Sequence, residues 1–152
     1  MRAKYLGLDL PSPIIVSSSP YTSNVKSVEQ CAASGAGAVV LKSIFEEQIL
    51  HHAASLEQYS DSPYGDAGDY LQRYLGEDYK AGFLRLVQEA RSKTELPVIA
   101  SINCVVDKGD WIEYATAMAD AGASALELNI FIQSTDIHAQ ARELELNYAE
   151  IV

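Results

Sequence analysis

Two similar stretches of sequence decide the fold class, residues 34–42 (SGAGAVVLK) and residues 121–129 (AGASALELN). In each stretch, small residues with a glycine end a helix-like segment, and a short, mainly apolar run follows. Runs of this kind are typical of strands that are buried on both faces of a parallel sheet. Each run ends in a polar residue, Lys42 in the first stretch and Asn129 in the second. The repeat therefore predicts parallel β-strands that alternate with helices.

The rest of the chain extends this pattern. Residues 4–10 indicate a small N-terminal hairpin, and residues 60–68 (SDSPYGDAG) indicate a long, exposed loop. We expect strands at residues 14–16, 38–41, 97–102 and 125–130, and helices at residues 25–34, 78–93, 111–122 and 138–152. This makes about four parallel βα units after a short hairpin. An open doubly wound sheet and half of a (β/α)8 barrel both satisfy the pattern.

Composition limits the class of protein. The chain has 152 residues, with 11 Lys and Arg against 21 Asp and Glu, and a formal charge of −10. This length suits one domain. The acidic balance speaks against nucleic acid or an anionic membrane surface as the main partner. Two cysteines make no disulfide framework, so we expect a reduced, cytoplasmic protein. As its partner we expect a small-molecule substrate.

Candidate site residues follow from where the strands end. In either architecture the site lies at the carboxyl ends of the strands. Lys42 there could contact an anion or a cofactor, or form a Schiff base, although a lysine whose ammonium simply reaches solvent is the alternative. Asn129 offers a donor and an acceptor to a ligand, or it caps a loop. Glu127 falls inside the fourth strand and could be a buried acid, but we expect an ion pair with Lys42 or another charge. The rule selects residues 17–19, 42–43, 101–104 and 129–132.

Cysteine and histidine give weaker candidates. Cys31 falls on a helix face and is expected in the core, whereas Cys104 follows a strand and could lie near the site. His51 and His52 have no partner at a recognised metal-ligand spacing, so we expect a surface helix there and no metal site.

Four segments together resemble the N-terminal half of a dihydroorotate dehydrogenase-type flavoprotein. They are residues 12–18 (SPIIVSS), 35–43 (GAGAVVLKS), 97–102 (PVIASI) and 125–129 (ALELN). The resemblance implies a (β/α)8 barrel that holds FMN at its carboxyl-end mouth and oxidises dihydroorotate in pyrimidine biosynthesis.

The same resemblance implies which residues contact the flavin. Ser17 and Ser18 match a loop that approaches the cofactor, and Lys42 and Ser43 match a lysine near the ring and its neighbour. Asn129 matches an asparagine that contacts flavin and substrate. A cation beside the pyrimidine end of the ring would stabilise the negative charge of the reduced flavin.

The sequence departs from this family on the substrate side. Where the family has a Ser-Cys-Pro-Asn type run, residues 130–134 read IFIQS. The base position falls on Ile132, which cannot accept a proton, and Ser134 is a weak substitute with nothing nearby to activate it. The substrate loop has no asparagine at residues 62–65 (SPYG). We therefore expect the substrate to be dihydroorotate or a related compound.

Chain length adds a further expectation. A whole barrel takes about 250 residues and eight strands, and the pattern here supplies about four. We expect either a fragment whose C-terminal half is missing, inactive alone, or a homo-oligomer that covers its open edges. Two alternatives remain, a Schiff-base aldolase-type barrel that uses Lys42 and a non-catalytic, self-associating half-barrel.

Overall fold

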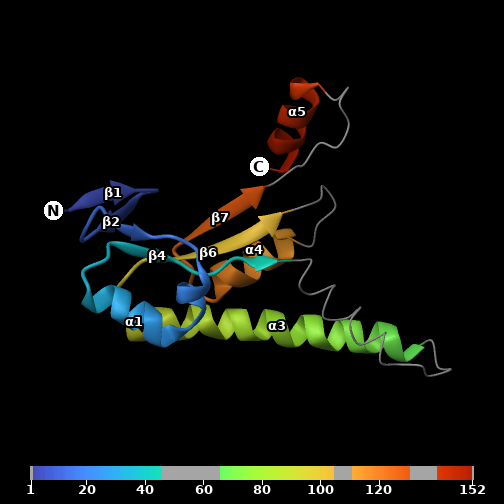
Figure 1. The fold of residues 1–152 in the computed structure, drawn as a ribbon, viewed down its shortest axis with the longest axis horizontal. Helices are drawn as coiled ribbons and strands as arrows, with labels where there is room; N and C mark the ends of the chain where they lie inside the picture. The colour runs from blue at the N-terminus through green and yellow to red at the C-terminus, as the bar shows by residue number, and fades with distance from the viewer. Residues whose placement is uncertain (1, 46–65, 105–110, 131–139, 152) are drawn as a thin grey trace.

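The protein is a mixed α/β structure in which a parallel sheet is preceded by a short antiparallel hairpin (Figure 1). The structure is a computed structural model and describes residues 2–45, 66–104, 111–130 and 140–151. In chain order the elements are β1 (Ala3–Tyr5), β2 (Leu8–Leu10), β3 (Ile15–Val16), the 3-10 helix η1 (Pro20–Ser23), α1 (Val25–Ala33), β4 (Ala38–Val40), β5 (Ile44–Phe45), α3 (Asp66–Lys93), β6 (Val98–Cys104), α4 (Trp111–Asp120), β7 (Ala125–Ile130) and α5 (Ala141–Ile151).

Strand β6 lies inside the sheet and has partners along both edges. Strands β4 and β5 pair with successive parts of one edge, and β7 pairs with the other. Strand β3 adds to β4 on the outside, and all of these pairings are parallel. Across the sheet, the strands therefore follow chain order without a reversal.

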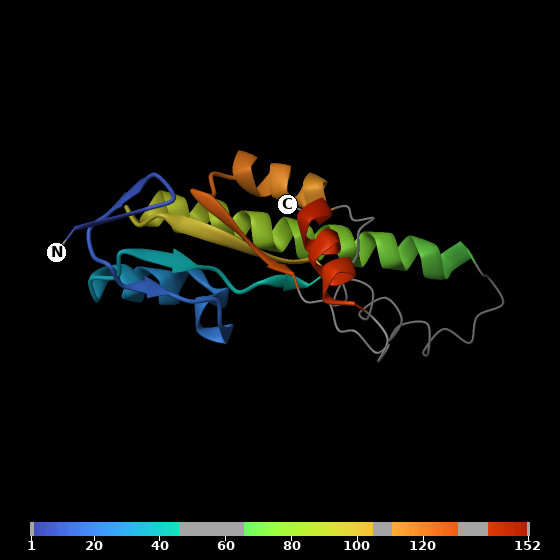
Figure 2. The same ribbon diagram turned by 90° about the horizontal axis from the view of Figure 1, so that it is seen from above.

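The main core lies between the sheet and three helices. Figure 2 shows α3 between α1 and α4, and the helices pack side by side. Alternate residues of the strands face them, because side chains in a strand point to opposite faces in turn. The core joins Val28 of α1, Val87 of α3 and Met118 of α4 to Val39 and Ala100 of the sheet. Cys31 of α1 is also buried, which confirms its expected place in the core.

The opposite face of the sheet changes character along the strands. Near the amino ends it is apolar, where Leu10 of the hairpin packs on Val40 and Ile99. Beyond that layer, toward the carboxyl ends, β6 and β7 pair Ser101 with Glu127 and then Asn103 with Asn129. The hairpin thus covers one end of this face, and the other end is polar.

The expected strands and the hairpin are confirmed, with shifts of a few residues at their ends. The main correction concerns α3, which begins at Asp66 and not near residue 78, so residues 66–68 of the expected loop are helical. The segment SDSPYGDAG favours a loop, but its last glycine, Gly68, costs a helix only about 1 kcal/mol relative to alanine. None of the described helices combines the length and apolar character needed to cross a membrane.

We predict that Met118→Ala lowers the free energy of unfolding by about 2–5 kcal/mol, because it leaves a cavity in the main core. Met118 is 0% exposed between α4 and the sheet. Ile112→Ala in the same helix is the control, since Ile112 is 63% exposed and its loss should change stability by about 0.5 kcal/mol at most. Urea unfolding of both variants measures this, and equal losses would contradict the described packing of α4.

Gly37 gives a second prediction, because a Cβ atom at this position would lie 1.8 Å from the carbonyl oxygen of Ser12. The Gly37 backbone N–H also donates to the Ile14 oxygen at 2.7 Å, which holds the chain before β4 against the start of β3. Gly37→Ala should therefore destabilise the protein strongly, by about 3 kcal/mol or more.

Gly82→Ala is the matched control for that substitution. Gly82 lies inside α3, and nothing lies within 4 Å of a Cβ atom built there. Alanine should therefore stabilise the helix by up to about 1 kcal/mol. Thermal unfolding should give shifts of opposite sign for the two variants, and a loss at Gly82 as large as at Gly37 would refute the close approach.

Candidate functional site

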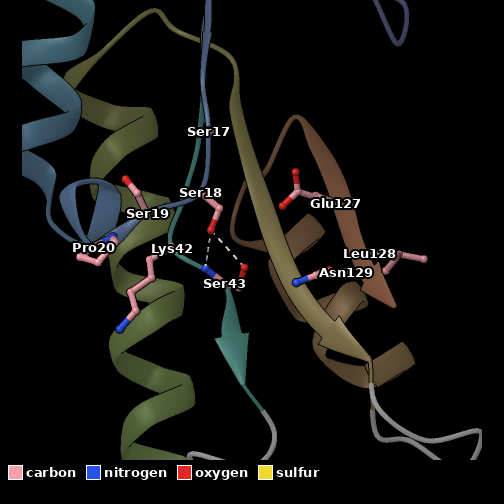
Figure 3. A pocket seen from close by; sticks show the side chains of 9 residues that line it. All are labelled: Ser17, Ser18, Ser19, Pro20, Lys42, Ser43, Glu127, Leu128 and Asn129. Carbon is pink, nitrogen blue, oxygen red and sulfur yellow. Dashed lines mark hydrogen bonds between the residues drawn. The ribbon is translucent and has the colours of Figure 1, made fainter. Parts of the chain in front are cut away.

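One open pocket lies at the carboxyl ends of the parallel strands (Figure 3). Its volume is about 730 Å³, within the range of roughly 300–1,000 Å³ that holds small-molecule ligands. Its walls come from the segment after β3, the β4–β5 segment and β7. The lining residues are Ser17, Ser18, Ser19, Pro20, Lys42, Ser43, Glu127, Leu128 and Asn129.

An extra residue between β4 and β5 shapes one wall of the pocket. Val40 pairs with Ile99, and Ile44 pairs with Ile102. From the first pair to the second, the β4–β5 segment advances by four residues, whereas β6 advances by three. The β4–β5 segment therefore holds one extra residue, as in a β-bulge. Leu41 and Ile44 both belong to the main core, so the two residues between them, 42 and 43, are left for the pocket side.

A series of hydrogen bonds runs beneath the pocket. It joins side chains from the segment after β3, the β4–β5 segment, β6 and β7. The Ser18 and Ser43 hydroxyl oxygens lie 3.0 Å apart, and those of Ser43 and Ser101 lie 2.8 Å apart. Ser101 donates to Glu127 Oε1 at 2.6 Å. The backbone N–H of Ser43 also donates to Ser18 Oγ, at 3.0 Å. We call these four side chains the serine–glutamate chain.

Lys42 and Glu127 do not form the ion pair that was expected. The structure corrects this prediction, because Glu127 accepts the Ser101 hydroxyl proton instead. Figure 3 shows Lys42 extending along the side of the pocket near Ser19 and Pro20, apart from Glu127. Within the described part of the chain, the ion pairs are Lys4 with Asp9 and Lys80 with Glu113, and none involves Lys42.

Two asparagines form a separate polar contact one layer beyond the serine–glutamate chain. Asn129 Nδ2 donates to Asn103 Oδ1 at 2.6 Å, across the β6–β7 pairing. Asn129 is exposed, and its second amide hydrogen and its carbonyl oxygen remain for a ligand. Loop capping, the alternative for Asn129, is not the contact found, since the residue lies within β7.

All five residues that the sequence suggested as cofactor contacts line the same pocket. Ser17 and Ser18 form one wall, Lys42 and Ser43 lie at the bulge, and Asn129 comes from β7. They belong to segments separated by up to about a hundred residues, so the fold brings them together.

The structure does not describe several other residues that the sequence suggested. Ile132, Ser134, His51 and His52 lie outside the described residues. The backbone of Cys104 ends β6, but its side chain is likewise outside what the structure describes. Among the described residues, no cluster of three or more His, Cys, Asp or Glu side chains could hold a metal ion.

Ser101, which the strand-end rule selects only as part of residues 101–104, is the central residue of the serine–glutamate chain. It is 0% exposed and joins Ser43 to Glu127. A signal was available, because period-two alternation from Ile99 places Ser101 on the face opposite the helices. A serine at a buried strand position needs a hydrogen-bond partner, and that requirement pointed to polar neighbours on both adjacent strands.

Comparison with known protein families does not identify the chain. No family model matches it.

Removal of the Ser43 hydroxyl should break the serine–glutamate chain and destabilise the fold. Ser43 is 7% exposed, and Ser43→Ala removes a partner from both Ser18 and Ser101. We predict a loss of about 1–3 kcal/mol in the free energy of unfolding. Ser92→Ala is the control, because Ser92 is exposed and bonds only to the Glu89 carbonyl in its own helix. Urea unfolding measures the free energy of unfolding of both variants. An unchanged value for Ser43→Ala would contradict the serine–glutamate chain.

Proposed function

We propose that the chain forms the first half of a dihydroorotate dehydrogenase-type (β/α)8 barrel and that its pocket binds the ring of FMN. In this proposal the complete barrel oxidises dihydroorotate or a related small molecule. The 152-residue chain supplies ring contacts and is inactive alone.

The observation that carries this proposal is the meeting of Ser18, Lys42, Ser43 and Asn129 around one pocket. They come from three segments far apart in sequence, and they meet where a barrel enzyme has its site. The strand order also supports the barrel, because a doubly wound sheet reverses its strand order at a switch point. The described order has no such reversal.

The lining fits the ring end of FMN better than the phosphate end. Hydroxyl and amide groups of Ser18 and Asn129 can bond the polar edge of a flavin ring. Among the described residues of the lining, Lys42 is the one cation, and the carboxylate of Glu127 disfavours a phosphate nearby. We therefore assign the ring to this pocket and the phosphate to residues outside it.

Lys42 has the clearest role in the proposed reaction. Bound FMN would supply hydride-accepting chemistry, and the protein would supply binding, orientation and electrostatics. Lys42, a half-buried residue, would support negative charge at the adjacent ring edge. Ser43, fixed by its backbone and side-chain bonds to Ser18, keeps the bulge and therefore Lys42 in place.

A Schiff-base aldolase-type barrel is the second candidate. It is favoured by one observation, the absence of any hydrogen bond or ion pair of the Lys42 ammonium within the described chain. Such a lysine is accessible to a carbonyl substrate in the pocket.

Titration of the purified chain with FMN tests the proposal through flavin fluorescence. We expect Lys42→Ala to weaken binding about tenfold or more, since a hydrogen bond to a charged group contributes about 1.5–3 kcal/mol. Riboflavin, which lacks the phosphate, should bind with similar affinity, because the pocket holds the ring. Lys26→Ala, an exposed lysine of α1, is the control and should bind as the wild type does.

Absence of binding, or equal binding by the Lys42→Ala and Lys26→Ala variants, would contradict the FMN proposal. Borohydride reduction in the presence of pyruvate separates the second candidate. A covalent adduct on Lys42 in the mass spectrum would favour the Schiff-base barrel, and an unmodified Lys42 would exclude it for this carbonyl probe.

A further inference from the structure

We propose that Ser18, Ser43, Ser101 and Glu127 form a proton relay between a ligand in the pocket and the carboxylate of Glu127. The relay deepens the proposed function and rests on it in one respect only, that FMN is taken as the ligand. The four side chains are joined by three successive contacts of 3.0, 2.8 and 2.6 Å. All three distances are within the normal range for bonds between oxygen atoms.

The carboxylate sets the direction of every hydrogen bond in the chain. An ionised carboxylate only accepts, so Ser101 must give its single proton to Glu127. The contact between Ser43 and Ser101 must then be donated by Ser43. By the same reasoning, Ser18 donates to Ser43.

This order leaves Ser18 with one role toward the pocket. Its proton points to Ser43, and one of its lone pairs accepts the Ser43 backbone N–H. A hydroxyl oxygen has two lone pairs, so a single lone pair remains for a ligand. While Glu127 is ionised, Ser18 therefore presents an acceptor to the pocket and selects an N–H or O–H group.

Transfer of a proton reverses the donor-to-acceptor direction of every hydrogen bond in the serine–glutamate chain, and no heavy atom has to move. The ligand gives its proton to Ser18, Ser18 passes its own to Ser43, Ser43 to Ser101, and Ser101 to Glu127. One O–H bond breaks and one forms at each serine oxygen, so the serines stay neutral. The ligand loses one proton, the Glu127 carboxylate gains it, and no electron moves. The reverse sequence returns a proton to the ligand.

Burial makes the relay useful. Ser101 is 0% exposed and Ser43 is 7% exposed, whereas Glu127 is exposed. A ligand that fills the pocket covers Ser18, which is only half-buried without it. The chain then links the covered ligand surface to a carboxylate on the opposite wall. Lys42 is the other charged group of the lining, and the Asn103–Asn129 pair lies one layer apart.

Hydroxyl-proton exchange with water in the ligand-free chain provides the first test. NMR should show slow exchange of the buried Ser101 and Ser43 hydroxyl protons relative to exposed serines. Because protons enter through the carboxylate, Glu127→Gln should slow both further, by about 100-fold, the lower end of what a positioned base contributes. Glutamine still accepts the Ser101 bond through its amide oxygen, so a purely structural role of Glu127 would leave both rates unchanged.

Two more variants separate the relay from its surroundings. Ser101→Ala cuts the chain, so the Ser43 hydroxyl should slow as it does in Glu127→Gln. Ser124→Ala is the control, since Ser124 also bonds between β6 and β7, accepting the Val98 N–H, but lies outside the relay. It should leave the rates unchanged. If Ser101→Ala fails to fold, Glu127→Gln alone decides, because its site is exposed. Unchanged exchange in Glu127→Gln overturns the relay.

FMN then serves as the pocket probe, with a readout that does not depend on turnover. Reoxidation by dioxygen of bound FMN that dithionite has reduced releases a ring proton, so the time-resolved difference infrared spectrum should show a transient protonated-glutamate band, which Glu127→Gln and Ser101→Ala should both lack. If FMN binds and the band is missing, or persists in Ser101→Ala, the relay is overturned and the proposed function stands. If FMN does not bind, the proposed function fails and hydroxyl exchange alone decides the relay.

Discussion

Strand β6 is the constraint on which the rest of the structure depends. It is paired along both edges, with β4 and β5 on one side and β7 on the other. Its alternate residues Val98, Ala100 and Ile102 face the helices. Its other residues therefore face away from them, and this set runs from apolar Ile99 to Ser101 and Asn103. A shift of one residue in register would exchange the two sets, so the packing of the helices also fixes the polar floor of the pocket.

The extra residue between β4 and β5 turns this sheet face into a site. Strict alternation after Leu41 would send residue 42 to the pocket and residue 43 to the core. Because the β4–β5 segment is one residue longer than β6, both Lys42 and Ser43 face the pocket side instead. Ser43 then bonds Ser18 and Ser101, which anchors the irregular backbone beside Lys42. The cationic side chain of Lys42 and the hydrogen bonds of Ser43 that hold its backbone in place thus come from adjacent residues.

The parts that the sequence predicted are those governed by local pattern. The repeated stretch at residues 34–42 and 121–129 predicted β4, β7 and the glycine-ended helices before them, and the strand-end rule selected the pocket residues. The parts that it missed depend on contacts between distant segments. The pairing of Ser101 with Glu127 needs the β6–β7 register, and the bulge shows itself only when β4 and β5 are aligned with β6.

The expected Lys42–Glu127 ion pair illustrates the same limit of local pattern. Lys42 follows one strand and Glu127 lies inside another, and opposite charges near one site suggest a pair. The prediction was wrong because the Lys42 side chain extends on the Ser19–Pro20 side of the pocket, apart from Glu127. Glu127 is bonded instead by Ser101, which lies on the strand between them.

Glu127 also limits what could complete a barrel around this pocket. A carboxylate enclosed by further strands loses solvation, and one neutral hydrogen bond from Ser101 does not offset that loss. Completing strands must therefore bring cationic or donor groups to the level of Glu127. A second copy of this chain, related by a two-fold axis along the barrel, would bring its own Glu127 to that level and a further formal charge of −10. Like charges enclosed together are unfavourable, so in the proposed barrel a copy of this chain would complete the site less favourably than a sequence that supplies cationic groups.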